Sequence, residues 1–168
     1  MRAADPVNSG YWLNSMRFYL LAVTLLNGVW EVLQLPLYTL WNSGNAGEIV
    51  LAILHCTLGD AMIASFSLLL ALLCFGGEAW PNQRFWRVAG SAILIGVCYT
   101  IYSEWKNTAV SQSWAYSVLM PSVFGIGLAP IAQWLVIPSG VFWWTYRRNL
   151  QASRLGISAS SKHSLIRR

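Results

Sequence analysis

The chain has 168 residues, of which 56% are hydrophobic and only 10% are charged, and its formal net charge is +5. Soluble globular domains carry about 25% charged residues, so this composition excludes an ordinary soluble fold and indicates a membrane protein of one domain. The basic excess does not indicate nucleic-acid binding, because the basic residues are distributed as markers of membrane topology.

Residues 1–16 are mixed in character, and we expect them to form a cytoplasmic tail. The apolar run that follows is too long for the core of a signal peptide and lacks a small-residue cleavage site, so a retained helix is predicted. A membrane-spanning helix needs about 20 residues, because the hydrocarbon core is about 30 Å thick. The sequence therefore predicts an all-α fold, a polytopic membrane four-helix bundle within residues 17–146, with spans at about 18–41, 48–75, 85–105 and 120–146.

The first span contains polar side chains at helical spacing, i, i+4, i+7 and i+11. These four residues fall on one face of a helix: Asn27, Glu31, Gln34 and Tyr38. An ionised side chain facing lipid at the helix centre costs about 2.5–3.5 kcal/mol. We therefore expect this face to turn toward the interior of the bundle.

The second span carries His55 and Asp60 in the segment HCTLGD. Five residues correspond to about 140° around a helix, so these two side chains cannot share one narrow face. We expect them to flank a groove and to meet different neighbours. Gly59 would allow another backbone to approach closely there.

The third span ends in the segment YTIYSEWKN, in which Thr100, Glu104 and Asn107 recur on one helical face. Small residues also occur one turn apart in this span, at Ala92 and Gly96. Such pairs allow transmembrane helices to pack closely. Polar residues are therefore not required for these helices to associate.

The fourth span is interrupted by Pro121, Pro130 and Pro138, with Gly125 and Gly127 between the first two prolines. An internal proline removes a backbone donor and kinks the helix. We expect an interfacial or re-entrant segment near residues 114–124, followed by a proline-kinked span. Non-helical backbone at membrane depth must be buried in protein or line a cavity.

Four spans place the N-terminal tail, the middle loop and the C-terminal tail on one side of the membrane. That side holds ten of the eleven Lys and Arg residues, and the other side holds only Lys106. This asymmetry predicts that both termini are cytoplasmic. Residues 147–168 are basic and rich in Ser, so we expect a disordered tail, and contact with anionic lipid headgroups is a compatible role.

Alternating helix directions place the ionisable residues near the outer half and the middle of the membrane. This predicts a cavity open to the outer side, in which Glu31, His55 and Asp60 form a proton-exchanging cluster. The candidate catalytic residues are Glu31, His55, Asp60 and Glu104. The candidate substrate-binding residues are Asn27, Gln34, Tyr38, Tyr99, Tyr102, Asn107, Tyr116 and Gln133.

We expect no metal and no cofactor. A single histidine within the apolar runs excludes bis-histidine haem in one chain, and the three cysteines have no metal-ligand spacing. The sequence also contains no phosphate-binding loop, no HExxH and no GxSxG motif.

Several segments carry a resemblance: WEVLQLPLYTLW, HCTLGD, YSEW, WAYSVLMP and APIAQWLVIP. Together they are similar to a group of small, uncharacterised bacterial inner-membrane proteins, over most of residues 28–139. The resemblance implies a compact four-helix membrane protein and no particular activity. A looser likeness to membrane isomerases of the sterol-isomerase type is limited to residue types, so no roles are carried over.

The leading hypothesis is an integral inner-membrane protein whose pocket binds a lipid-like small molecule or processes it by acid–base chemistry. One alternative is a proton- or cation-coupled transport or channel subunit, which would require a homo-oligomer because four helices are few for a transporter. The other is a structural or assembly subunit of a membrane complex, in which the polar residues only join helices. The sequence leaves open whether the protein is an enzyme.

Overall fold

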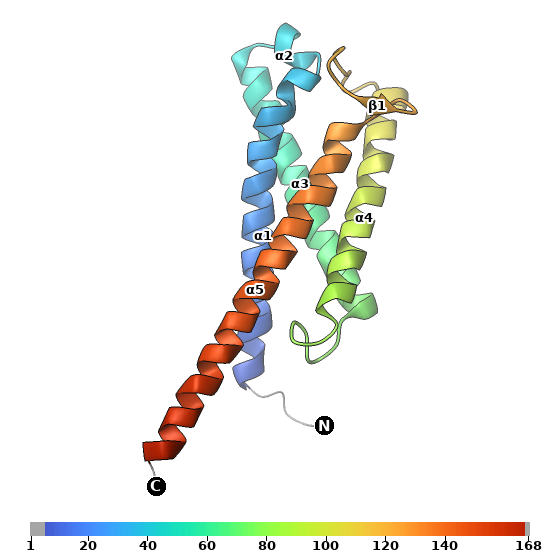
Figure 1. Cartoon of the computed structure of the whole chain (residues 1–168). Coiled ribbons are helices and arrows are strands. Elements are labelled where there is room, and N and C mark those ends of the chain that lie inside the picture. Colours follow the sequence, from blue (N-terminus) through green and yellow to red (C-terminus); the bar gives the residue numbers. More distant parts are fainter. Residues whose placement is uncertain (1–5, 167–168) are drawn as a thin grey trace.

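The computed structural model describes residues 6–166, with side chains described from 12 to 151, and it is mostly helical (Figure 1). Helix α1 packs against α3 and α5, and α4 packs against the same two helices. Helix α1 begins and α5 ends at the same end of the bundle, while the short helix α2 lies at the opposite end (Figure 1). The helices are α1 (Pro6–Gln34), α2 (Leu40–Ser43), α3 (Ala46–Phe75), α4 (Phe85–Trp105) and α5 (Leu128–Ile166).

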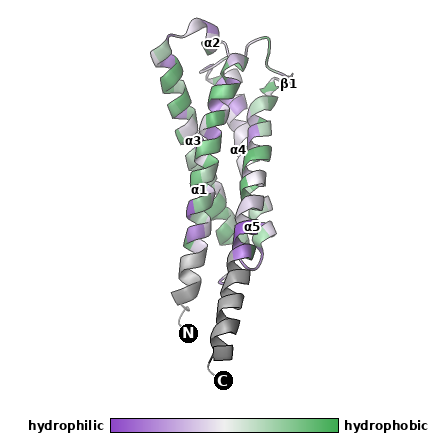
Figure 2. Cartoon of the chain, turned by 60° about the vertical axis from the view of Figure 1, so that its left-hand side comes forward, coloured by the Kyte–Doolittle hydropathy of each residue, from purple (hydrophilic) through white to green (hydrophobic). Residues whose placement is uncertain are grey.

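Three segments are long and apolar enough to cross a membrane, namely Trp12–Leu37, Ala46–Phe75 and Phe85–Val110. Hydrophobic residues occupy much of their length (Figure 2), and large apolar side chains are exposed, among them Leu33 and Leu73. Such surfaces suit contact with lipid. Helix α5 is not among these segments within the part of the chain that the structure describes.

The first helix differs from its predicted limits at both ends. It begins at Pro6, so residues 6–16 are helical instead of a separate tail. It also ends at Gln34, whereas a single helix was expected over residues 18–41. Pro36 cannot donate a backbone hydrogen bond, and a 3-10 turn, η1 (Leu35–Leu37), follows α1 before the chain becomes extended at Tyr38.

Helices α3 and α4 agree with the predicted spans to within two residues. Asn45 caps α3, because its side chain accepts from the backbone N–H of Glu48 while the Glu48 carboxylate accepts from the N–H of Asn45. Helix α4 covers the predicted residues 85–105 and continues into a π-helical turn, η2 (Lys106–Val110). Such turns occur frequently at functional sites.

The segment before α5 corrects the predicted start of the fourth span. Residues 120–127 are not helical, and they include an antiparallel pair of short strands, β1 (Ser122–Val123) and β2 (Ile126–Gly127). Phe124 and Gly125 form the turn, with φ angles of 52° and 79°. Helix α5 begins at Leu128, so Pro130 falls in the first turn, where a missing N–H leaves no helical bond unmade.

Helix α5 continues far beyond the predicted end of the fourth span. It contains Pro138 and runs to Ile166, so residues 147–166 are helical where a disordered tail was expected. The extension lacks proline and is rich in good helix formers such as Arg, Leu, Gln and Ala, which favours continuation of the helix.

The bundle contains a dry core made of aromatic and small side chains. The rings of Tyr19 on α1 and Phe142 on α5 are stacked with centroids 4.1 Å apart. Ala92 is buried on α4, and a Cβ atom added at Gly96 would lie only 2.4 Å from the indole ring of Trp134. The Ala92–Gly96 pair therefore admits α5 close to α4, as small residues do in membrane helices.

Candidate functional site

The amide of Gln133 on α5 lies at the centre of a buried polar network. Its Nε2 atom is within hydrogen-bonding distance of Asn27 Oδ1 (3.3 Å), Glu31 Oε1 (3.0 Å) and Asp60 Oδ2 (2.8 Å). Gln133 is 2% exposed. An amide nitrogen has two hydrogens, so it can donate fully to only two of these three acceptors at a time.

Asp60 lies on α3 with both carboxyl oxygens occupied. Oδ2 accepts from Gln133, and Oδ1 accepts from the indole Nε1–H of Trp134 at 3.2 Å. Because Gln133 and Trp134 are consecutive on α5, one segment of that helix holds the whole carboxyl. Buried carboxyls that accept such bonds keep a defined position.

Glu31 on α1 is 9% exposed and is held by amides from two helices. Gln34 Nε2 donates to Glu31 Oε1 at 2.8 Å, and Gln133 Nε2 donates to the same oxygen. Gln34 is oriented in turn by the Trp30 indole, which donates to its Oε1 at 3.1 Å. Glu31 and Asp60 are thus neighbours that share one donor.

The third carboxyl, Glu104 on α4, is fixed by the loop before α5. The Tyr116 hydroxyl donates to Glu104 Oε2 and accepts from the backbone N–H of Gly127 at 2.9 Å. Burial and the hydrogen bond to Glu104 raise the pKa of Tyr116 above its usual value. The hydroxyl therefore remains a proton donor to Glu104 at neutral pH.

Backbone hydrogen bonds join this loop to the end of α1. Thr39 N donates to Ala115 O at 3.0 Å, and Ser117 N donates to Leu37 O at 2.9 Å. Tyr38 also faces Tyr116, with ring centroids 5.6 Å apart. Burial raises the pKa of Tyr38, so its hydroxyl is neutral. The break at Pro36 thereby connects α1 to the segment that orients Glu104.

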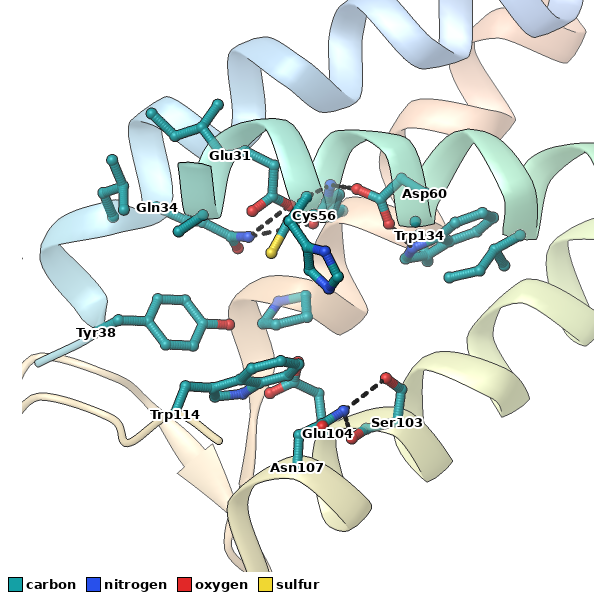
Figure 3. A pocket seen from close by; sticks show the side chains of 18 of the residues that line it. Glu31, Gln34, Tyr38, Cys56, Asp60, Ser103, Glu104, Asn107, Trp114 and Trp134 are labelled. Atoms are coloured by element: carbon teal, nitrogen blue, oxygen red, sulfur yellow. Dashed lines mark hydrogen bonds between the residues drawn. The ribbon is translucent and has the colours of Figure 1, made fainter. Parts of the chain in front are cut away.

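A cavity of about 400 Å³ lies between these groups (Figure 3). Small-molecule sites typically measure about 300–1,000 Å³, so this one is large enough for a ligand. Its polar lining comes from α1, α3, the end of α4 and α5. The lining includes Glu31, Gln34, Tyr38, His55, Cys56, Asp60, Tyr99, Ser103, Glu104, Asn107, Trp114, Gln133 and Trp134, together with apolar residues such as Leu35, Ile53, Met62 and Ile63.

All four candidate catalytic residues line this cavity. Glu31, Asp60 and Glu104 are buried, whereas His55 is exposed and makes no hydrogen bond to another described side chain that would fix its ring. His55 and Asp60 both border the cavity although their side chains leave α3 in different directions. Hydrogen bonds therefore hold the three carboxyls in position, whereas none to a described side chain holds the ring of His55.

The candidate substrate-binding residues divide into two groups. Three of them do not line the cavity: Asn27, Tyr102 and Tyr116. Asn27 accepts a hydrogen bond from Gln133, and Tyr116 donates one to Glu104, so both contact lining residues. Tyr102 is exposed and its ring packs beside Trp105. The others line it directly: Gln34, Tyr38, Tyr99, Asn107 and Gln133.

Sequence reasoning missed four lining residues that have polar, thiol or aromatic side chains. They are Cys56, Ser103, Trp114 and Trp134. Cys56 lies one helical turn before Asp60, so helical spacing could have found it. Trp134 follows Gln133 directly, about 100° further around the helix, so helical spacing did not indicate it. Trp114 lies in a loop, where no periodic pattern exists to indicate its position.

Within the described residues, no group of three or more His, Cys, Asp or Glu side chains is arranged to hold a metal ion. Comparison with family models, with curated proteins and with solved structures found no match. The chemistry of the cavity must therefore be argued from its own residues.

Proposed function

We propose that the protein binds a lipid-like small molecule in this cavity and exchanges protons with it. One observation supports the proposal above the rest: carboxyls from three different helices meet in one cavity whose remaining lining is mainly apolar and aromatic. An amphiphile would place its head group among the carboxyls and its tail along the apolar residues.

The membrane arrangement is part of the proposal. Helix α5 would be the fourth span, because it packs along α1 and α4 beside segments that are apolar enough to cross a membrane. The basic residues near the start of α1, before α4 and along α5 would then mark the cytoplasmic side. The cavity would open in the outer half of the membrane, near the end of the bundle that carries α2.

The neighbouring carboxyls of Glu31 and Asp60 are suited to proton exchange. Both accept from Gln133 Nε2, and two adjacent negative charges away from water repel each other. A shared proton relieves this repulsion and can be given to a ligand, while the other carboxyl can accept one. Glu104, held separately by Tyr116, would orient the ligand from the opposite wall.

A variant that fills the cavity tests the binding function. Gly59 lines the cavity, and a Cβ atom added there meets nothing within 4 Å, so Gly59→Leu places a side chain in the open space. Gly90 on α4 is equally free of contacts but does not line the cavity, so Gly90→Leu is the matched control. Native mass spectrometry should find a lipid-like molecule bound to the wild type and to Gly90→Leu, and none bound to Gly59→Leu.

If all three proteins carry the same lipids in the same amount, the cavity is not the binding site and the proposal is wrong. Equal helical content and equal elution in size-exclusion chromatography must first show that both variants fold. A cavity that never holds a ligand in any of the three would favour a purely structural role for the polar network.

The proton exchange has its own test in Glu31→Gln, which keeps the shape of the side chain and removes the carboxyl. If Glu31 exchanges protons with carbon atoms of the ligand, the wild type in D2O should place deuterium on its bound ligand, whereas the variant should not. Mass spectrometry of the extracted ligands measures this difference. Identical ligands in both proteins would contradict the chemistry and leave the binding function standing.

A further inference from the structure

The ionisable side chains that line the cavity are mainly acidic. Three carboxyls face it, from Glu31, Asp60 and Glu104, and no Lys or Arg is among the lining residues. Among the residues whose side chains are described, His55 supplies the one basic group in the lining. An anionic ligand would therefore meet three carboxyls in this lining and no Lys or Arg to compensate them.

The nearest basic residue along α4 does not change this balance. Lys106 begins η2, but it is exposed and does not line the cavity, although its neighbour Asn107 does. The arginines whose side chains are described occur near the start of α1, before and at the start of α4, and in the middle of α5: Arg17, Arg84, Arg87, Arg147 and Arg148. None of these five lines the cavity.

Aromatic rings complete the lining in a way that suits a cation. Tyr38, Tyr99, Trp114 and Trp134 come from four different segments of the chain and all border the cavity. In Figure 3, Tyr38 and Trp114 extend from the side of the η1 turn and the loop toward the space between Glu31 and Glu104. A cation over the face of Trp or Tyr gains about 0.5–2 kcal/mol, and the gain is largest where water is excluded.

We propose that the head group bound in this cavity is a cation, so that the ligand is a lipid-like amine and not an anionic lipid or a fatty acid. This inference rests on the proposed binding function and names its ligand class. The ammonium group would sit between the Glu31–Asp60 pair and Glu104, against the aromatic rings. The alkyl portion would lie along Leu35, Ile53, Met62 and Ile63.

Three photoreactive probes of equal chain length test the head-group preference. Each carries a diazirine in its alkyl chain, and the chains end in a primary amine, an alcohol or a carboxylate. The full-length protein is placed in nanodiscs of phosphatidylcholine, a zwitterionic lipid, and is then irradiated, digested and analysed by mass spectrometry. Labelling of cavity residues such as Leu35 and Ile63 is divided by labelling of the exposed Phe66 and Leu73, which corrects for partition into lipid.

The amine should give a ratio about tenfold above that of the alcohol, as one additional charge-assisted contact would produce, and the carboxylate should give the lowest ratio. Glu104→Gln should reduce the preference for the amine. Glu78→Gln is the matched control, because Glu78 is exposed in the loop before α4 and does not line the cavity.

Equal enrichment of the amine and the alcohol would overturn the inference about charge, while the binding of a lipid-like molecule would stand. Enrichment of the carboxylate above the amine would overturn it as well. If no probe labels the cavity above the lipid-facing positions, both the inference and the proposed function fail.

Discussion

The two halves of the bundle are built from the same four long helices but differ in what fills them. In the dry half, near the start of α1 and the middle of α5, the core consists mainly of apolar side chains around Tyr19, Leu68 and Phe142, and the buried polar groups include the hydroxyls of Ser67 and Thr145. Near α2, the same helices enclose amides, carboxyls and a cavity. Among the described residues, no carboxyl is buried in the dry half, so buried carboxyls are not required merely to join these helices.

The largest loss of stability should follow from creating a cavity in the apolar core of the dry half. Phe142→Ala removes a ring that is 2% exposed and stacked on Tyr19. Unfolding in detergent should show a loss of about 3 kcal/mol, at the low end for buried aromatic truncation because lipid solvates apolar groups as well. Phe66→Ala, at a position 67% exposed, is the control and should change little. Equal losses would show that packing is not concentrated in the dry half.

A smaller loss of stability should follow when a buried amide in the other half is replaced by an apolar side chain of similar size. Gln133→Met deprives Asn27, Glu31 and Asp60 of a donor, and unpaired buried groups should cost about 2 kcal/mol. The same change at the exposed Gln83 is the control. Chemical unfolding followed by circular dichroism measures both. If Gln133→Met were as stable as the control, the network would not contribute to the fold.

The smallest loss of stability is expected from a change beside Glu104, which lines the cavity. Tyr116→Phe removes the hydroxyl between Glu104 and the Gly127 N–H, for a loss of about 1 kcal/mol at neutral pH. The pKa of Tyr116 is raised in the folded protein, so its contribution is complete below the unfolded pKa of about 10 and declines at higher pH.

The stability advantage of the wild type over Tyr116→Phe should therefore shrink as the pH rises above about 10. Thermal unfolding of both proteins between neutral pH and this range measures the difference. Effects of pH on the rest of the protein are common to both proteins and cancel in the comparison. A difference that stays constant across the range would show that the hydroxyl is not held more tightly in the folded state.

The helices were predictable wherever a local signal marks their limits. Asn45 and Glu48 form a capping box that any reading of the sequence can find, and α3 begins beside it. The break after Gln34 was missed because hydropathy continues through Pro36, although the proline itself indicated it. The helical extension of α5 to Ile166 was missed because its basic, Ser-rich composition was taken to indicate disorder.

The inward orientation of Glu31 was predictable from helical periodicity and from the free-energy cost of exposing an ionised side chain to lipid. Glu31 had to avoid lipid, and its face also carried Asn27 and Gln34, so an inward orientation was predictable from one helix alone. The partner of that face was not predictable. Gln133 could have pointed elsewhere on α5, and only the packing of α1, α3 and α5 places it between Asn27, Glu31 and Asp60.

The sequence by itself determined the apolar helices and the polar face of the first one, because hydrophobic runs and helical spacing are local properties that every fold of the chain must respect. Only the tertiary structure decided which polar groups meet. Trp134 fits against Gly96 and donates to Asp60, and Tyr116 reaches Glu104 from a loop, because contacts between distant segments depend on how closely helices approach and not on spacing along the chain.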